Sequence, residues 1–138
     1  MVARPVLIVD DDIDHAVILR TVLASVAPDA QTDTCTDPRR LPDALLEAAP
    51  EAVVFMDRML GGVESLGYLA QLREERSDLV VIVLSSALSE DDRERARRAG
   101  ATEALEKPGT LAEWRSMLAR VMADATRDSD SERPARAG

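Results

Sequence analysis

Short, continuous apolar runs alternate with amphipathic stretches along this chain of 138 residues. A run without polar positions predicts a strand that is buried on both faces, as in parallel sheets. Helical stretches separate the runs, so the sequence predicts an α/β fold: a three-layer (βα)5 sandwich with a five-stranded parallel sheet and right-handed crossovers. The predicted strands cover Val6–Val9, Ala30–Cys35, Ala52–Met56, Leu79–Leu84 and Thr102–Glu106.

Capping residues mark where the predicted helices begin. Asp37-Pro38, Ser89-x-x-Asp92 and Thr110-x-x-Glu113 are typical helix starts. Together with periodic apolar positions they predict helices at residues 13–26, 38–48, 65–75, 90–99 and from 111 onward. The helix over residues 90–99 has only Ala96 and Ala99 as apolar anchors, which predicts an element of low stability.

One domain is expected over residues 1–123, followed by a disordered acidic and polar tail over residues 124–138. The tail contains no apolar side chain larger than alanine. It therefore offers too little surface to offset the entropy lost on ordering.

Composition excludes several classes of partner. The net charge is −9, with 17 basic and 26 acidic residues and only one Trp, one Tyr and one Phe. Such a chain repels phosphate backbones and offers few stacking platforms, so we expect no direct DNA binding. No apolar run approaches the ~20 residues that span a bilayer, and the single cysteine fits a reducing compartment. We expect a cytoplasmic protein whose partners are proteins or small phosphorylated groups.

Polar residues follow four of the predicted strands: Asp10, Asp11 and Asp12 the first, Asp57 the third, Ser85 the fourth and Lys107 the fifth. Simpler roles exist for each, namely a helix cap for Asp12, a turn for the serine, and solvated surface charges for Asp57 and the lysine. Parallel sheets bind ligands at this carboxyl edge, however. The convergence of all these groups therefore favours a functional site.

The chemistry of this set points to phosphoryl transfer. Clustered carboxylates repel one another, and a hard cation such as Mg²⁺ relieves that repulsion while keeping water and phosphate oxygens in its shell. A carboxylate can act as a nucleophile and form an acyl phosphate. The metal and a lysine then neutralise charge on the transferring group, and a hydroxyl can hydrogen-bond its oxygens.

The segments VLIVDDD, VVFMDRML, VVIVLSS and ATEALEKP, in this order and spacing, resemble the receiver domain of two-component response regulators. The resemblance covers about residues 4–123. It implies a flavodoxin-like sheet of order 2-1-3-4-5 and a stand-alone response regulator, similar to the chemotaxis regulator, acting in a two-component or phosphorelay system.

The resemblance also implies a role for each acidic residue. Asp57 would be the phosphoacceptor and take a phosphoryl group from a phosphohistidine on a sensor histidine kinase or histidine phosphotransfer protein. Asp11 and Asp57 would hold Mg²⁺ directly, with the backbone carbonyl of Met59 as a third ligand and Asp10 acting through water. The chain would catalyse only its own phosphorylation and dephosphorylation.

Ser85 and Lys107 occupy the positions of the family's switch hydroxyl and its lysine. The resemblance implies a cis peptide bond before Pro108. It also implies that the fourth helix, fifth strand and fifth helix form a signalling face for a downstream protein or for a second copy of the chain. Ala104 departs from the family, because an aromatic switch residue usually stands there. We therefore predict that phosphorylation acts by a population shift of the helix over residues 90–99; a static, salt-bridged helix is the alternative.

Two other functions remain open at this point. A Mg²⁺-dependent phosphohydrolase of the haloacid dehalogenase type would use Asp10 as nucleophile and Asp12 as its partner, but leaves Asp57 unexplained. A receiver that docks without being phosphorylated is the other alternative. His15 is interpreted as an exposed helix residue, with a phosphohistidine role as its alternative.

Overall fold

The computed structural model describes the backbone of residues 3–137 and the side chains of residues 3–126. Its main sheet is parallel, with strand order β2-β1-β3-β6-β7. These strands are β1 (Val6–Val9), β2 (Thr32–Cys35), β3 (Val53–Asp57), β6 (Val80–Ser85) and β7 (Glu103–Glu106). Counted within the sheet, this order is 2-1-3-4-5, so the predicted flavodoxin-like α/β fold is confirmed.

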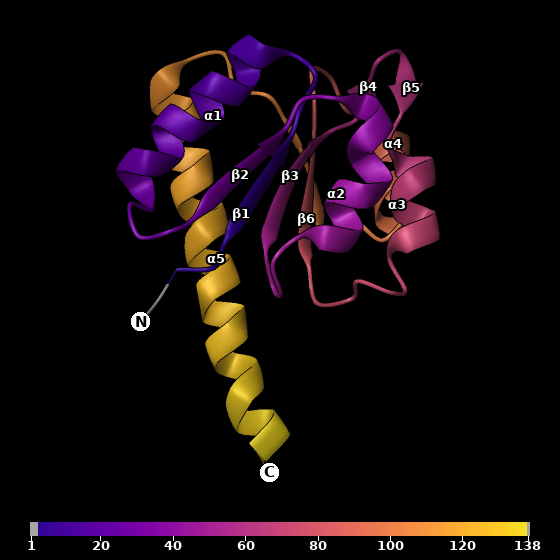
Figure 1. Ribbon diagram of the computed structural model, residues 1–138. Coiled ribbons are helices and arrows are strands. Elements are labelled where there is room, and N and C mark those ends of the chain that lie inside the picture. Colours follow the sequence, from indigo (N-terminus) through magenta and orange to yellow (C-terminus); the bar gives the residue numbers. More distant parts are fainter. Residues whose placement is uncertain (1–2, 138) are drawn as a thin grey trace.

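Helices cover both faces of the sheet (Figure 1). One face packs against α1 (Ile13–Val26) and α5 (Leu111–Ala137), and the other against α2 (Leu41–Glu47), α3 (Leu66–Leu72) and α4 (Glu90–Arg98). A short 3-10 turn, η1 (Pro38–Arg40), precedes α2. Within the described residues no helix has both the length and the apolarity needed to cross a bilayer.

Strand residues alternate between the two cores. Ile8, Phe55 and Ile82 pack on the α1–α5 side. Leu7 and Val54 pack on the opposite side. Because successive side chains point to opposite faces, a strand buried on both sides must be apolar throughout. This explains why the continuous apolar runs predicted the central strands correctly.

Helix α5 crosses the boundary predicted at residue 124, whereas the disorder predicted for the tail over residues 124–138 stays a prediction. Helix α5 continues through Ala137, and Ala125 lies at 3% exposure in the core shared with α1. Packing of Ala125 in the core shared with α1 explains why the helix passes the predicted boundary, since most helical stability in proteins comes from tertiary packing. Gly138 lies outside the described residues.

A small second sheet was not predicted. Strands β4 (Met59–Leu60) and β5 (Val63–Glu64) form an antiparallel hairpin directly after β3. Its two loop residues, Gly61 and Gly62, have φ values of 57° and 79°. Two-residue hairpin loops favour such positive φ angles, which glycine adopts without strain. The Gly-Gly pair in the sequence was therefore a usable signal for a hairpin.

Candidate functional site

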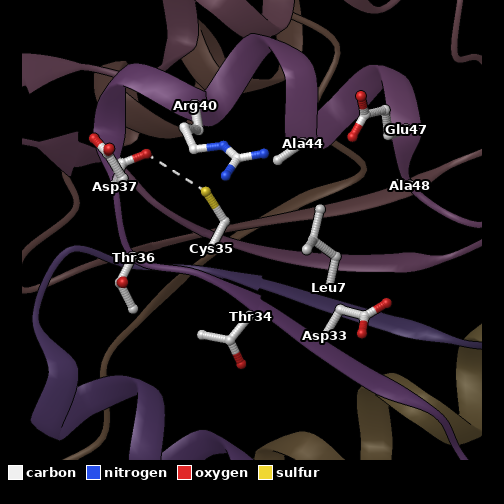
Figure 2. A pocket seen from close by; sticks show the side chains of 10 residues that line it. All are labelled: Leu7, Asp33, Thr34, Cys35, Thr36, Asp37, Arg40, Ala44, Glu47 and Ala48. Atoms are coloured by element: carbon white, nitrogen blue, oxygen red, sulfur yellow. Dashed lines mark hydrogen bonds between the residues drawn. The ribbon is translucent and has the colours of Figure 1, made fainter.

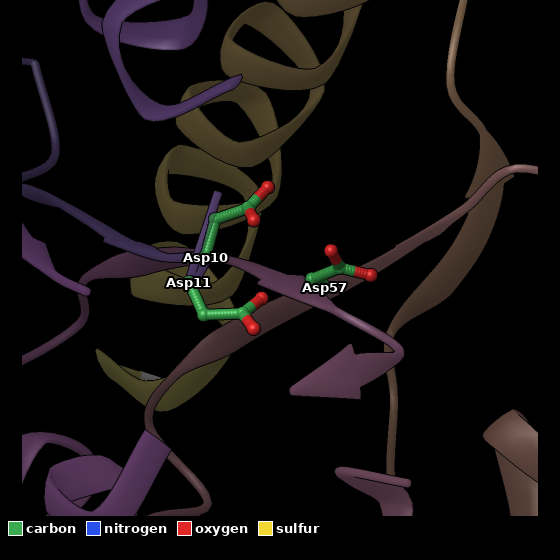
Figure 3. A group of neighbouring side chains, drawn as sticks. All are labelled: Asp10, Asp11 and Asp57. Atoms are coloured by element: carbon green, nitrogen blue, oxygen red, sulfur yellow. The ribbon is translucent and has the colours of Figure 1, made fainter. Parts of the chain in front are cut away.

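Three carboxyl groups meet at the carboxyl edge of the sheet. Asp10 and Asp11 follow β1, and Asp57 is the last residue of β3, the strand paired with β1 (Figure 3). One oxygen from each of the three lies within 4.8 Å of the others. The sequence prediction that these residues converge is thus confirmed as geometry.

Asp10 is the buried member of this cluster, with 1% of its surface exposed. Burial raises the pKa of Asp10 above its ordinary value. The backbone N–H of Asp12 donates to Asp10 Oδ1 at 2.9 Å, and this bond and the nearby Lys107 charge oppose the rise. Burial thus disfavours the charged form of Asp10, and a nearby cation favours it.

Lys107 supplies that positive charge from the loop after β7. Its Nζ lies 3.0 Å from Asp57 Oδ2 and 3.6 Å from Asp10 Oδ2. The Lys107 backbone N–H donates to the Ser85 carbonyl at 2.8 Å, which ties the loop to the end of β6. The peptide bond to Pro108 is trans, so the expected cis bond is wrong. Trans is the isomer favoured for most X–Pro bonds, and the expectation came from resemblance alone.

Ser85 ends β6 and is nearly buried, but its hydroxyl is not bonded to the carboxylates. Ser85 Oγ donates to the Ala87 carbonyl at 3.0 Å. The hydroxyl therefore lies at the predicted edge of the sheet but is directed along its own loop. A change of side-chain rotamer would direct it elsewhere.

The β4–β5 hairpin braces the acidic cluster from the other side. The Met59 N–H donates to Asp57 Oδ1 at 3.2 Å, and the Gly61 N–H donates to Asp11 Oδ2 at 3.0 Å. Ser65, buried after β5, donates from Oγ to the Asp57 carbonyl at 2.8 Å. Two of the three carboxylates are thus held by backbone groups of one tight turn.

Asp12 has the simpler role considered for it. It is the N-cap of α1, and its carboxylate accepts from the backbone N–H groups of Asp14 and His15. His15 does not have the plain exposed role predicted for it: its side chain is 37% exposed, and its Nδ1 lies 3.1 Å from Lys107 Nζ. The chain contains one histidine and one lysine, and both are at this site.

The site fits a hard divalent cation. Its three carboxylates face one ammonium group, which leaves an excess of negative charge at a place rich in oxygen donors. Mg²⁺ is commonly held by one or two carboxylates together with water and phosphate oxygens. Asp10, Asp11 and Asp57 are the groups that can hold such an ion, and Asp57, half-buried beside Lys107, can serve as a nucleophile.

A separate hollow of about 390 Å³ lies between β2 and α2 (Figure 2). It is lined by Cys35, Arg40 and Glu47 among others, and Cys35 Sγ donates to the Asp37 carbonyl at 3.4 Å. None of the predicted site residues lines it. The hollow and the acidic cluster therefore share no residues.

Comparisons with known proteins agree with this geometry. The family model for the response regulator receiver domain matches residues 6–119. The receiver domain of a DNA-binding response regulator from Colwellia psychrerythraea 34H is 23% identical, with a TM-score of 0.73 over 86% of this chain and 97% of its own. A CheY-like receiver from Methanospirillum hungatei JF-1 is 15% identical, with a TM-score of 0.74 over 91% and 98%.

The beryllofluoride-activated NtrC4 receiver domain dimer is also similar, at 24% identity and a TM-score of 0.69 over 88% of this chain and 98% of its own. At these identities the solved structures establish the fold. A search of curated proteins finds no match.

Proposed function

Since the chain belongs to the family of response regulator receiver domains, we propose that it is a phosphoacceptor of a two-component or phosphorelay system, with Asp57 as the phosphorylated residue. One observation carries this proposal. Asp57 lies at the end of β3 with its Oδ2 3.0 Å from Lys107 Nζ and with carboxylate oxygens of Asp10 and Asp11 within 4.8 Å. A carboxylate beside a fixed ammonium group is arranged to accept a group whose charge the ammonium then neutralises.

The reaction is a direct displacement. An Asp57 oxygen attacks the phosphorus of a phosphohistidine, the new P–O bond forms as the P–N bond breaks, and the nitrogen lone pair returns to the donor imidazole. Lys107 lies where negative charge on the phosphoryl oxygens can be neutralised. The Met59 N–H, which already donates to Asp57, keeps the carboxylate in one orientation. The chain thereby promotes its own phosphorylation and dephosphorylation and turns over no separate substrate.

The proposed metal ligands are Asp11 and Asp57 directly, the backbone carbonyl of Met59, and Asp10 through water. The convergence of the three carboxylates within 4.8 Å supports this assignment. When bound, Mg²⁺ supplies charge neutralisation for the phosphoryl oxygens. Gly61 fixes Asp11 through its backbone N–H, so this ligand is oriented before any ion arrives.

Ser85 is proposed to respond to the phosphoryl group. Its hydroxyl would leave the Ala87 carbonyl and donate to a phosphoryl oxygen instead. That exchange frees the carbonyl of the loop that leads into α4. Because Ala104 has no ring to rotate, the response would pass through this loop and shift the population of α4 positions, altering the face of α4, β7 and α5 that a downstream protein binds.

The proposed partners are proteins and the proposed location is the cytoplasm. A phosphohistidine on a sensor kinase or phosphotransfer protein is the donor that fits the chemistry of Asp57. A second copy of the chain is the alternative partner for the signalling face, since the similar NtrC4 receiver is a dimer when activated with beryllofluoride. Sedimentation velocity with and without beryllofluoride would separate a dimer from a monomer that awaits another protein.

The geometry disfavours the hydrolase alternative. That mechanism needs Asp10 as an accessible nucleophile and Asp12 as an acid close to it. Asp10 is 1% exposed, and the Asp12 carboxylate is engaged as the N-cap of α1. Asp57, with 14% of its side chain exposed, is the more accessible nucleophile.

Intact-protein mass spectrometry after incubation with acetyl phosphate and Mg²⁺ tests the proposed function. We expect one phosphoryl adduct on the wild type and none on Asp57→Asn. The matched control is Asp10→Asn, which should keep a site for the adduct while forming it more slowly. An adduct that persists in Asp57→Asn and disappears in Asp10→Asn would support the hydrolase instead, and no adduct in any variant would leave a receiver that only docks.

A further inference from the structure

His15 brings an imidazole to the one lysine of the chain. We propose that His15 is a positioning residue, which accepts a hydrogen bond from the Lys107 ammonium and fixes its direction for transfer to Asp57. This role rests on the proposed phosphoacceptor function. It adds a residue of α1 to a site otherwise built from the ends of strands.

The donors and acceptors of the two side chains determine which group donates in this contact. An ammonium group has three donors and no acceptor, so in this 3.1 Å contact Lys107 donates and His15 Nδ1 accepts, which is the arrangement of the tautomer with its proton on Nε2. The same nitrogen lies 3.5 Å from Asp12 Oδ2 and 3.8 Å from Asp10 Oδ2. Those contacts are longer and would require Nδ1 to donate, so the contact with Lys107 is the one that satisfies the geometry.

Two acceptors lie within hydrogen-bond distance of Lys107 Nζ, namely Asp57 Oδ2 at 3.0 Å and His15 Nδ1 at 3.1 Å, and Asp10 Oδ2 lies at ion-pair distance, 3.6 Å. Two of these groups are well fixed. Asp10 is buried, and His15 belongs to the first turn of α1, where Asp12 accepts its backbone N–H. The lysine side chain is only 12% exposed, so water has limited access to it.

Transfer changes only one of the three contacts. The group at Asp57 grows from a carboxylate to an acyl phosphate, while Asp10 and His15 stay where they are. The hydrogen bond to His15 and the ion pair with Asp10 keep the N–H that faces Asp57 directed at the reacting group throughout the displacement. Without His15 that N–H turns to water and the ammonium samples more orientations, which slows the transfer step and leaves donor binding unchanged.

The matched variants are His15→Asn and His15→Leu. Their side chains have nearly the same size, but only asparagine can place an acceptor oxygen where Nδ1 lies. The first readout is the ¹⁵N-edited NMR signal of the lysine ammonium in untagged, Mg²⁺-free protein, which needs no assignment because the chain has one lysine. We expect the signal in the wild type and His15→Asn, and its loss through fast exchange with water in His15→Leu.

The second readout is the rate of phosphorylation by acetyl phosphate with Mg²⁺. We expect His15→Leu to lower the limiting rate about fivefold, the effect of one partly exposed hydrogen bond, with an unchanged half-saturating concentration. His15→Asn should stay within about twofold of the wild type. Equal rates and equal ammonium signals in the wild type and His15→Leu would overturn the positioning role, as would equally slow Asn and Leu variants. A wild type that takes no phosphoryl group would instead overturn the proposed function itself, and the NMR signal keeps the two failures apart.

Discussion

The helices α1 and α4 lie on opposite faces of the same sheet and are held by different forces. Helix α1 buries Ala16, Leu19, Val22 and Leu23, whereas α4 buries only Ala96. Apolar burial is worth roughly 1.5–3 kcal/mol for each large side chain, so packing holds α1 more strongly than α4. We therefore predict that a chemical event at Asp57 moves α4 rather than α1.

Polar contacts take the place of packing around α4. Arg58, the residue directly after Asp57, lies 3.2 Å from Asp92 through its Nη1, and Asp92 forms the capping box of α4 with Ser89. Arg93 Nη1 donates to the Ala104 carbonyl at 2.8 Å and joins α4 to β7. These polar contacts lie at the edge of the core and not within it, so we predict that they can rearrange without unfolding the core.

The largest expected effect comes from the packed side. Leu19→Ala leaves a cavity between α1 and the sheet and should lower the free energy of unfolding by about 3 kcal/mol. The control is Ala96→Gly in α4, which removes one methyl group. Because glycine is a poorer helix former than alanine, this change should lower the free energy of unfolding by about 1 kcal/mol. Urea denaturation of both variants would measure this contrast, and equal losses would refute it.

A smaller effect is expected at the start of α4. Asp92→Ala removes both the capping box and the contact with Arg58, and should lower the local opening free energy of residues 90–98 by about 1 kcal/mol. Hydrogen exchange should show the change in α4 and none in α1. Glu90→Ala, at an exposed position in the same turn, is the control for the loss of a negative charge. Similar exchange in the two variants would mean that the cap and ion pair do not hold the helix.

The smallest expected effect is on the pH dependence of the free energy of unfolding, to which Asp10 and Asp78 contribute with opposite signs. Burial raises the pKa of Asp10 above 3.8, so its contribution to stability is full below pH 3.8 and is lost as pH rises through the raised pKa. Hydrogen bonding by Arg76 lowers the pKa of Asp78 to about 2, so its contribution is present above pH 3.8 and is lost as pH falls to about 2.

Urea denaturation of Asp10→Asn and Asp78→Asn across this range, without Mg²⁺, checks these signs. Relative to Asp10→Asn, the free energy of unfolding of the wild type should fall as pH rises above 3.8. Relative to Asp78→Asn, it should fall as pH drops below 3.8. Curves that run parallel to the wild type would contradict both assignments.

The sequence predicted the parts of this molecule that depend on local pattern. Continuous apolar runs identified the central strands, and the ends of those strands identified Asp10, Asp11, Asp57, Ser85 and Lys107 as neighbours. The contact of His15 with Lys107 joins residues 92 positions apart and depends on the reach of a side chain, which periodicity does not encode. The hairpin after Asp57 had a Gly-Gly signal that was interpreted only as a loop.

We predict that a group bound at Asp57 alters α4 and leaves α1 in place. Hydrogen exchange measured by mass spectrometry, with and without beryllofluoride and Mg²⁺, tests it directly, with occupancy checked by ¹⁹F NMR and Asp57→Asn as the control. We predict that exchange changes over Glu90–Arg98 and stays constant over Ile13–Val26, and that the control shows neither change. Bound beryllofluoride with unchanged exchange in α4, or with equal changes in both helices, would contradict the claim.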